Sequence, residues 1–145
     1  METALTTTDT DTAARLRRAI TRLNRRLRAS GLGGLTAAQA SLMSSVESLG
    51  SPSLGELAAA EQIQPPSVTH AVRDLESAGM IVSSRDPSDR RCTRVRLTTQ
   101  GRRELMAVRA RKTQFLNQRL AMLSPAERRR AEEATAFLER LLEGE

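Results

Sequence analysis

The chain has 145 residues and a mass of 15.9 kDa, the size of one domain with one hydrophobic core. Its 39% hydrophobic and 28% charged residues indicate a globular protein, and no apolar run reaches the length of a membrane span. A single cysteine, Cys92, and a single histidine, His70, exclude a disulfide framework and most cysteine- or histidine-based metal sites, so we expect no metal and no cofactor. The N-terminus lacks the basic and apolar regions of a secretory signal, and we expect a cytoplasmic protein without membrane contacts.

The charge balance points to a polyanionic partner. Lys and Arg total 23 against 17 for Asp and Glu, which gives a net charge of +6 and a pI near 11.2. The sequence has no Trp or Tyr, and its only aromatic residues are Phe115 and Phe137. Because proteins that grip single strands usually stack bases on aromatic rings, double-stranded DNA is the favoured partner.

The first helical pattern follows a Thr-rich stretch, residues 1–11, which we expect to be a disordered tail. From residue 12 to 29, four aliphatic residues have the 4-3-4 spacing of a heptad seam, and seven arginines occupy the rest of the helix. The seam consists of Leu16, Ile20, Leu23 and Leu27. A membrane-surface helix is the alternative, but the narrow stripe without an aromatic anchor is more typical of a helix–helix contact.

The middle of the chain carries signals for three short helices and a hairpin. Capping boxes that begin at Thr36 and Ser53 open two helices, and Pro65-Pro66 opens a third that stops at Gly79. The next residues, 80–85 and 92–97, read as two strands joined by a charged turn. Three helices followed by a hairpin predict a winged helix-turn-helix lobe over residues 36–99.

Two longer helices complete the chain, one from Thr99 to about Leu123 and one opened by a capping box at Ser124. The predicted fold is mainly α with a small β-hairpin wing, in a single domain over residues 12–142. Residues 12–35 and 100–142 are expected to form a helical dimerisation region from both chain ends, because their apolar faces exceed what one small lobe can cover. At the C-terminal end these faces comprise Phe137, Leu138, Leu141 and Leu142.

Three stretches carry a resemblance to a known family: residues 75–81, 86–91 and 95–101. The pattern Asp-x-x-Asp-Arg-Arg followed by Leu-Thr-x-x-Gly resembles the MarR family of bacterial transcription regulators. The preceding helix fits the same family at Pro66, Ser67, Thr69, Val72, Leu75 and Glu76. The resemblance implies a homodimeric winged helix-turn-helix protein that binds palindromic operator DNA, usually represses, and is often released by a small-molecule effector or by oxidation.

The helix expected over residues 66–78 has two faces. Val68, Ala71, Val72 and Leu75 fall on one side and should be core. A helix of this width fits the major groove, where Ser and Thr can bond bases or phosphates. The residues expected to bind DNA from the other side are Pro66, Ser67, Thr69, His70 and Arg73. His70 departs from the family, which commonly has arginine there.

The charged turn should form the tip of the wing. Asp86 and Asp89 can pair with one arginine and stabilise the tip, which leaves another arginine for the minor groove. By resemblance, minor-groove insertion is assigned first to Arg90, and Arg91 is interpreted as the partner of Asp89 or Asp86. Ser88 stands where many relatives have arginine.

In the following strand, Arg94 and Arg96 are expected to face phosphates. Cys92 lies beside these arginines and could sense oxidants, since nearby positive charge lowers a thiol pKa. The alternative is a small residue in a strand.

These patterns predict a dimeric, sequence-specific DNA-binding transcription regulator, with repression as its expected mode. A sequence-tolerant architectural DNA-binding protein and a module that only binds small molecules remain as alternatives. An enzyme is not expected, because His70 has no nucleophile to activate and the chain has neither a phosphate-binding loop nor a paired-carboxylate site.

Overall fold

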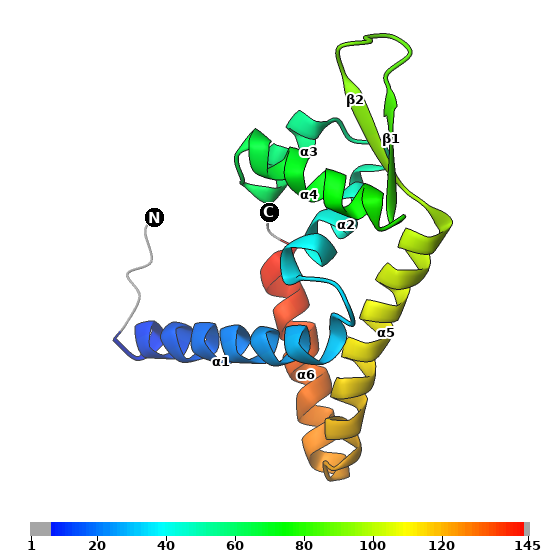
Figure 1. Ribbon diagram of the computed structural model, residues 1–145. Coiled ribbons are helices and arrows are strands. Elements are labelled where there is room, and N and C mark those ends of the chain that lie inside the picture. The colour runs from blue at the N-terminus through cyan, green and yellow to red at the C-terminus, as the bar shows by residue number, and fades with distance from the viewer. Residues whose placement is uncertain (1–6, 144–145) are drawn as a thin grey trace. The chain divides into compact units, whose positions relative to one another are not determined.

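The computed structural model describes residues 7–143, with side chains from Thr10 onward. Residues 7–143 form six helices and one hairpin in the predicted order, which can be followed in Figure 1. The helices are α1 (Thr7–Gly31), α2 (Ala37–Leu49), α3 (Leu54–Glu61), α4 (Pro65–Ser77), α5 (Thr99–Ala121) and α6 (Pro125–Leu142). The strands β1 (Ile81–Arg85) and β2 (Thr93–Leu97) pair antiparallel. The predicted fold class, mainly α with a hairpin wing, is therefore confirmed.

The chain forms two compact units whose boundary falls inside α5. One extends to Lys112 and holds the winged-helix lobe, and the other begins at Thr113 and holds the end of α5 with α6. The three expected capping boxes are present. In each, the side-chain oxygen of Thr36, Ser53 or Ser124 accepts a backbone N–H at 3.1–3.3 Å.

Helix α1 begins earlier than the sequence predicts. The expected disordered tail reached residue 11, but residues 7–11 are helical, and residues 1–6 lie outside the described residues. The reason is electrostatic: Asp11 lies near the positive end of the helix dipole and one turn before Arg15. At the other end α1 runs to Gly31, and Gly33 turns the chain with a φ of +59°.

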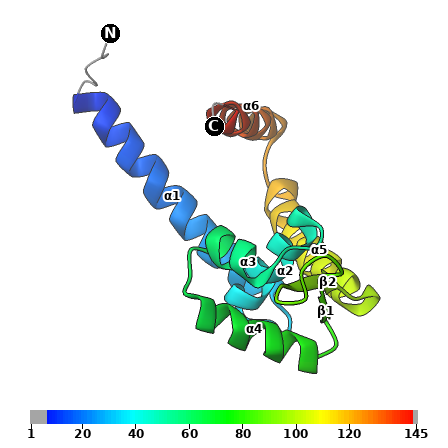
Figure 2. The ribbon, with the colours of Figure 1, turned by 90° about the horizontal axis from the view of Figure 1, so that it is seen from above.

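One core joins α2, α3, α4 and the hairpin, which Figure 2 shows gathered together. Its fully buried side chains include Leu42, Leu57, Leu75, Val95 and Leu105. Since Leu105 and Val108 of α5 are buried, the lobe continues past residue 99, where its end was expected. Residues 100–112 are therefore part of the lobe's own packing as well as of a long helix.

The start of α5 is held close to the end of α4. A Cβ added at Gly101 would lie 1.9 Å from the Met80 carbonyl oxygen, so only glycine allows this approach. Thr98 strengthens the corner, because its hydroxyl donates to the Gly79 carbonyl at 2.6 Å. The corner orients the hairpin, which lies between α4 and α5 in sequence.

The register of the hairpin gives it two unlike faces. Ile81 pairs with Leu97 and Ser83 with Val95 on the core side, whereas Val82 pairs with Arg96 and Ser84 with Arg94 on the other. The loop before α3 pairs with β2 over a short stretch. The Val95 N–H donates to the Pro52 carbonyl at 2.9 Å, and Ser53 forms an isolated antiparallel β-bridge with Arg94. Figure 1 shows the outer part of the hairpin projecting beyond α2, α3 and α4.

Each unit exposes apolar side chains of the expected dimerisation seams. In α1, Ile20 and Leu23 are 47% and 45% exposed, and Leu16 and Leu27 are half-buried. In α6, Phe137, Leu141 and Leu142 are exposed and Leu138 is half-buried. No helix within residues 7–143 is both long enough and apolar enough to cross a membrane.

Candidate nucleic-acid interface

Helix α4 presents the expected polar face to solvent. Val68, Val72 and Leu75 are buried, and Ala71 packs partly buried against the same core. The helix spans Pro65–Ser77, one residue earlier than predicted, because the first of the two prolines occupies its first turn. All five side chains expected to bind DNA from this helix are exposed: Pro66, Ser67, Thr69, His70 and Arg73.

Two polar side chains on this face bond within α4. The Thr69 hydroxyl donates to the Pro65 carbonyl at 3.1 Å, and His70 Nε2 lies 3.5 Å from Asp74 Oδ2. Both contacts are exposed to solvent. Arg73 makes no ion pair with any residue that the structure describes, so its guanidinium is available to a ligand.

The wing tip is a turn ordered by two aspartates. Asp86 Oδ1 accepts the N–H of Ser88 at 2.7 Å and that of Asp89 at 3.3 Å. The Cys92 N–H donates to the Asp89 carbonyl, and the Asp86 N–H donates to the Cys92 carbonyl, both at 2.9 Å. These bonds close the turn across its base.

The two tip arginines differ in their partners. Arg91 Nε lies 3.3 Å from Asp89 Oδ1, which is the pairing expected for it. Arg90 makes no ion pair within the described range, and its carbonyl accepts a hydrogen bond from Arg85 Nη1 at 2.8 Å. The exposed Arg90 side chain thus carries a positive charge at the tip that no described carboxylate neutralises.

Arg94, which was expected to face phosphates, is instead bonded to groups of the lobe itself. Its Nε lies 2.7 Å from Asp86 Oδ2, its Nη1 lies 2.9 Å from Glu56 Oε2, and Nη1 also donates to the Ser51 carbonyl at 3.3 Å. Because two carboxylates and a carbonyl already accept hydrogen bonds from this guanidinium, Arg94 is not free for the phosphate contact that was expected of it. Arg96, by contrast, is exposed on the outer face of β2 and has no ion pair among residues 7–143.

The contacts of Arg94 change the acidity of its partners. Its hydrogen bond is the largest cause that holds the pKa of Asp86 below the usual value, and the Ser88 N–H acts in the same direction. The pKa of Glu56 is lowered mainly by the backbone N–H of Ser53, with a smaller contribution from Arg94. Both carboxylates are therefore ionised near neutral pH.

Sequence reasoning missed Glu56 and Glu76 as residues that position the wing. Glu56 was recognised only as part of a capping box, and it lies 38 residues before its ion-pair partner. Glu76, part of the family pattern, accepts the Ser83 N–H at 2.8 Å and so attaches β1 to α4. No periodic pattern marks either contact, because each joins two different elements, α3 with β2 for Glu56 and α4 with β1 for Glu76.

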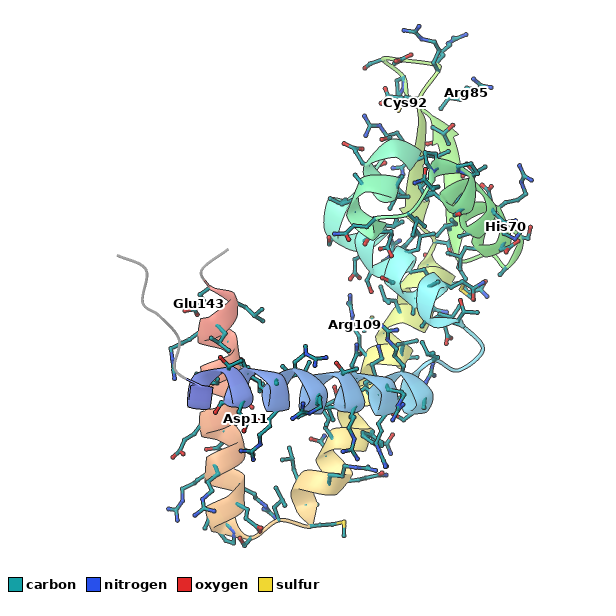
Figure 3. All side chains as sticks on the ribbon, turned by 90° about the vertical axis from the view of Figure 1, so that its left-hand side faces the viewer. Asp11, His70, Arg85, Cys92, Arg109 and Glu143 are labelled. Carbon is teal, nitrogen blue, oxygen red and sulfur yellow. The ribbon has the colours of Figure 1, made fainter. Side chains whose placement is uncertain are left out.

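Cys92 lies near the base of the wing tip, as Figure 3 shows, and its thiol is free and half-buried. Its neighbours in a shallow hollow include Leu54, Asp89 and Arg91. An oxidant-sensing role for Cys92 stays a prediction.

A second hollow, about 270 Å³ in volume, lies where α1, α2 and α5 meet. Three basic residues, Arg28, Arg109 and Lys112, contribute to its lining beside Asn24 and Ser41. Arg109 Nη2 also pairs with Glu47 Oε2 at 2.5 Å. Arg28 and Lys112 make no ion pair with the described residues, so the hollow carries unneutralised positive charge.

Comparison with known proteins matches residues 35–93 to the model of the MarR family. The HTH-type transcriptional regulator Mb0904 of Mycobacterium bovis is 30% identical over 121 residues, which cover 83% of this chain and 85% of that protein. The HTH-type transcriptional regulator YdgJ of Bacillus subtilis is 42% identical over 67 residues, a match that spans only 41% of that protein.

Solved structures share the fold along most of the chain. A transcriptional regulator protein of Pseudomonas aeruginosa has a TM-score of 0.84 and 33% identity, covering 97% of this chain and all of that one. BpsR of Bordetella bronchiseptica, whose DNA binding is regulated by 6-hydroxynicotinic acid, has a TM-score of 0.62 and 28% identity over 92% of this chain and 98% of that one. MepR of Staphylococcus aureus, solved as a mutant bound to an oligodeoxyribonucleotide, shares the fold with a TM-score of 0.71 and 19% identity over 90% of this chain and 97% of that one. The fold, the wing and the match to Mb0904 together show that the chain belongs to the MarR family of winged helix-turn-helix transcription regulators.

Proposed function

We propose that the protein is a homodimeric repressor that binds a palindromic operator in double-stranded DNA. The observation that carries this proposal is the combination, on one lobe, of an exposed polar face on α4 with an unpaired arginine at the wing tip. The DNA complex of MepR, which has the same fold, supports it. An enzymatic role has no support from the family, whose members named here are transcription regulators.

In this proposal α4 enters the major groove and the wing enters the minor groove. Ser67, Thr69, His70 and Arg73 read or position base edges, with Pro66 at the helix start against the backbone. At the wing, Arg90 inserts into the minor groove, where the negative potential attracts it. Arg91 and Arg96 contact phosphates, and Asp86 with Asp89 keeps the tip in shape.

The exposed apolar seams support the proposed homodimer. Ile20 and Leu23 of α1 and Leu141 of α6 are each about half exposed in the single chain, and a second copy would cover them. Two copies related by a two-fold axis place two α4 helices on successive major grooves, about one helical turn of DNA apart.

The test is selection of bound fragments from a random pool of duplex DNA. We expect an enriched motif with two inverted half-sites whose centres lie about 10 base pairs apart. Equal retention of all sequences, with a steep salt dependence, would favour the sequence-tolerant architectural protein instead.

We further propose that the hollow between α1, α2 and α5 binds a small anionic effector. Its free basic residues, Arg28 and Lys112, suit a carboxylate, and BpsR is a relative regulated by a carboxylic acid. In a thermal-shift panel of small aromatic acids that includes 6-hydroxynicotinic acid, at least one should raise Tm. Arg28→Gln and Lys112→Gln should reduce that shift, and Arg129→Gln on α6 serves as a matched control. Absence of any shift would reject an effector of this class.

A further inference from the structure

We propose that Arg94 is a positioning residue that holds the wing at the orientation from which Arg90 reaches DNA, and that Arg94 does not itself contact the phosphates. The inference rests on the proposed function, because it concerns how that DNA contact is built. We name the group formed by Arg94, Asp86, Glu56 and the Ser51 carbonyl the wing clamp.

The wing clamp connects three separate parts of the lobe through one guanidinium. Arg94 stands in β2, Asp86 opens the turn at the wing tip, and Glu56 lies in the first turn of α3. Ser51 belongs to the loop between α2 and α3. The hydrogen bonds of Arg94 therefore fix the tip of the hairpin relative to the helical part of the lobe.

Apolar packing alone does not fix that orientation, because no apolar side chain of the outer hairpin is fully buried. Val95 and Ile81 are the last buried residues along the two strands, and no side chain from residue 84 to 94 is buried. A two-stranded ribbon without a hydrophobic face is only marginally stable and twists easily. The charged contacts of Arg94, whose side chain is 35% exposed and whose partner Asp86 is 15% exposed, attach the tip, which the bonds of Ser83 and Val95 nearer the core do not reach.

The charges of the wing clamp argue against a direct role in binding phosphates. One arginine is matched with two carboxylates, so the cluster is net negative where the lobe is proposed to meet DNA. Simple electrostatics then makes Glu56 unfavourable for DNA binding. A positioning role gives Glu56 a favourable effect through Arg94, and the two accounts predict opposite signs for its removal.

Glu56→Gln provides the decisive measurement. Glutamine preserves the capping box with Ser53, because Gln serves at this helix position, but it removes the charge that holds Arg94. We expect operator affinity to fall about fivefold, although a negative charge has been removed, since hydrogen bonds to charged groups stabilise more than neutral ones. The matched control is Glu61→Gln at the end of α3, which removes one negative charge outside the wing clamp, keeps an amide oxygen that can accept the Ser45 hydroxyl, and should leave affinity unchanged or raise it.

Substitutions at Arg94 separate the clamp from a direct contact. Arg94→Lys keeps the positive charge but loses the fork that reaches Asp86 and Glu56 together, so it should lower affinity almost as much as Arg94→Met, about tenfold. A phosphate contact would survive in Arg94→Lys. Circular dichroism and Tm of each variant verify that the lobe remains folded, and Glu56→Gln still tests the clamp if Arg94→Met does not fold.

A double-mutant cycle shows what the clamp acts on. Arg90→Ala should cost much less affinity in the Arg94→Met background than in the wild type, because a displaced wing no longer delivers Arg90. Ser67→Ala on α4 should cost the same in both backgrounds. Equal costs of Arg90→Ala in both, or a Glu56→Gln protein that binds as well as the wild type, would overturn the proposal.

The cycle can be measured on any duplex that the wild type binds, so it is separable from the proposed function. A wild type that binds all sequences alike, with the coupling present, rejects the sequence-specific regulator and keeps the clamp. A wild type that prefers an operator but shows no coupling rejects only the clamp. A wild type that binds no duplex rejects both.

Discussion

The two elements proposed to touch DNA are attached to the lobe by different forces. Helix α4 is held by apolar side chains, Val68, Val72 and Leu75, which are buried in the shared core. The outer wing is held by hydrogen bonds and ion pairs around Asp86 and Arg94. Burial depends little on pH and salt, whereas ion pairs depend on both. The position of α4 on the lobe should therefore vary little with pH and salt, whereas the position of the outer wing should vary with both.

The largest expected effect comes from a test of whether burial in the core holds α4 in place. Leu75→Ala leaves a cavity in the core and should reduce the free energy of unfolding by about 2–5 kcal/mol. Urea unfolding followed by circular dichroism measures the loss. Val82→Ala, at a half-exposed position of β1, is the control and should change stability by less than about 0.5 kcal/mol. A loss for Leu75→Ala no larger than that of the control would show that α4 is not held by the core.

Operator binding is also proposed to need two lobes, one from each copy of the homodimer. Leu23→Glu combined with Leu141→Glu places charges in both exposed seams and should dissociate the proposed homodimer. Since a monomer offers one α4 and one wing, operator affinity should fall by about 100-fold or more as the multivalent gain is lost. Sedimentation measures the mass directly. A wild type that sediments near 15.9 kDa at micromolar concentration contradicts the dimer without any mutation.

The structure explains which parts of this arrangement could be predicted from sequence. Helix starts at Thr36, Ser53 and Ser124, and the double proline of α4, are local signals in which a residue bonds to others within one turn. The exposed face of α4 follows from its apolar spacing. The MarR resemblance supplied the assignment of the wing tip, which composition alone did not contain.

The parts that were missed depend on contacts between distant residues. Arg94 looks like a free surface charge in sequence, because Glu56 and Ser51 lie about 40 residues away. The lobe was ended at residue 99 because nothing local shows that Leu105 belongs to the same buried core as residues of α2 and α4. Both errors come from tertiary packing, for which a single sequence carries no periodic signal.

The proposed DNA contacts of the wing and of α4 should differ in how their loss changes salt dependence and base preference. Arg90→Ala should weaken binding to many sequences and lower the salt slope by about one unit, since one positive charge that displaces counterions from the minor groove is lost. Arg73→Ala should instead cost about 1–3 kcal/mol on the selected operator and relax the preference at one or two base pairs of each half-site. Salt titration and a base-substitution series on both variants measure this. Unchanged salt slope for the first and unchanged base preference for the second would show that the lobe docks differently.

The smallest expected effect is the pH dependence of the wing attachment. The pKa of Asp86 in the folded protein is held below its usual value, chiefly by Arg94 and then by the Ser88 N–H. A carboxyl group with a depressed folded pKa contributes stability that is complete above its unfolded pKa and is lost as pH falls through its folded pKa. We therefore expect Asp86→Asn to lower Tm at neutral pH and to approach the wild type as the pH falls below about 4. Thermal unfolding of both proteins between neutral and acidic pH measures the difference, and the Tm difference caused by Leu75→Ala should stay nearly constant over the same range. If Asp86→Asn and Leu75→Ala show the same pH profile, the wing and α4 are held by the same kind of force, and the distinction between them fails.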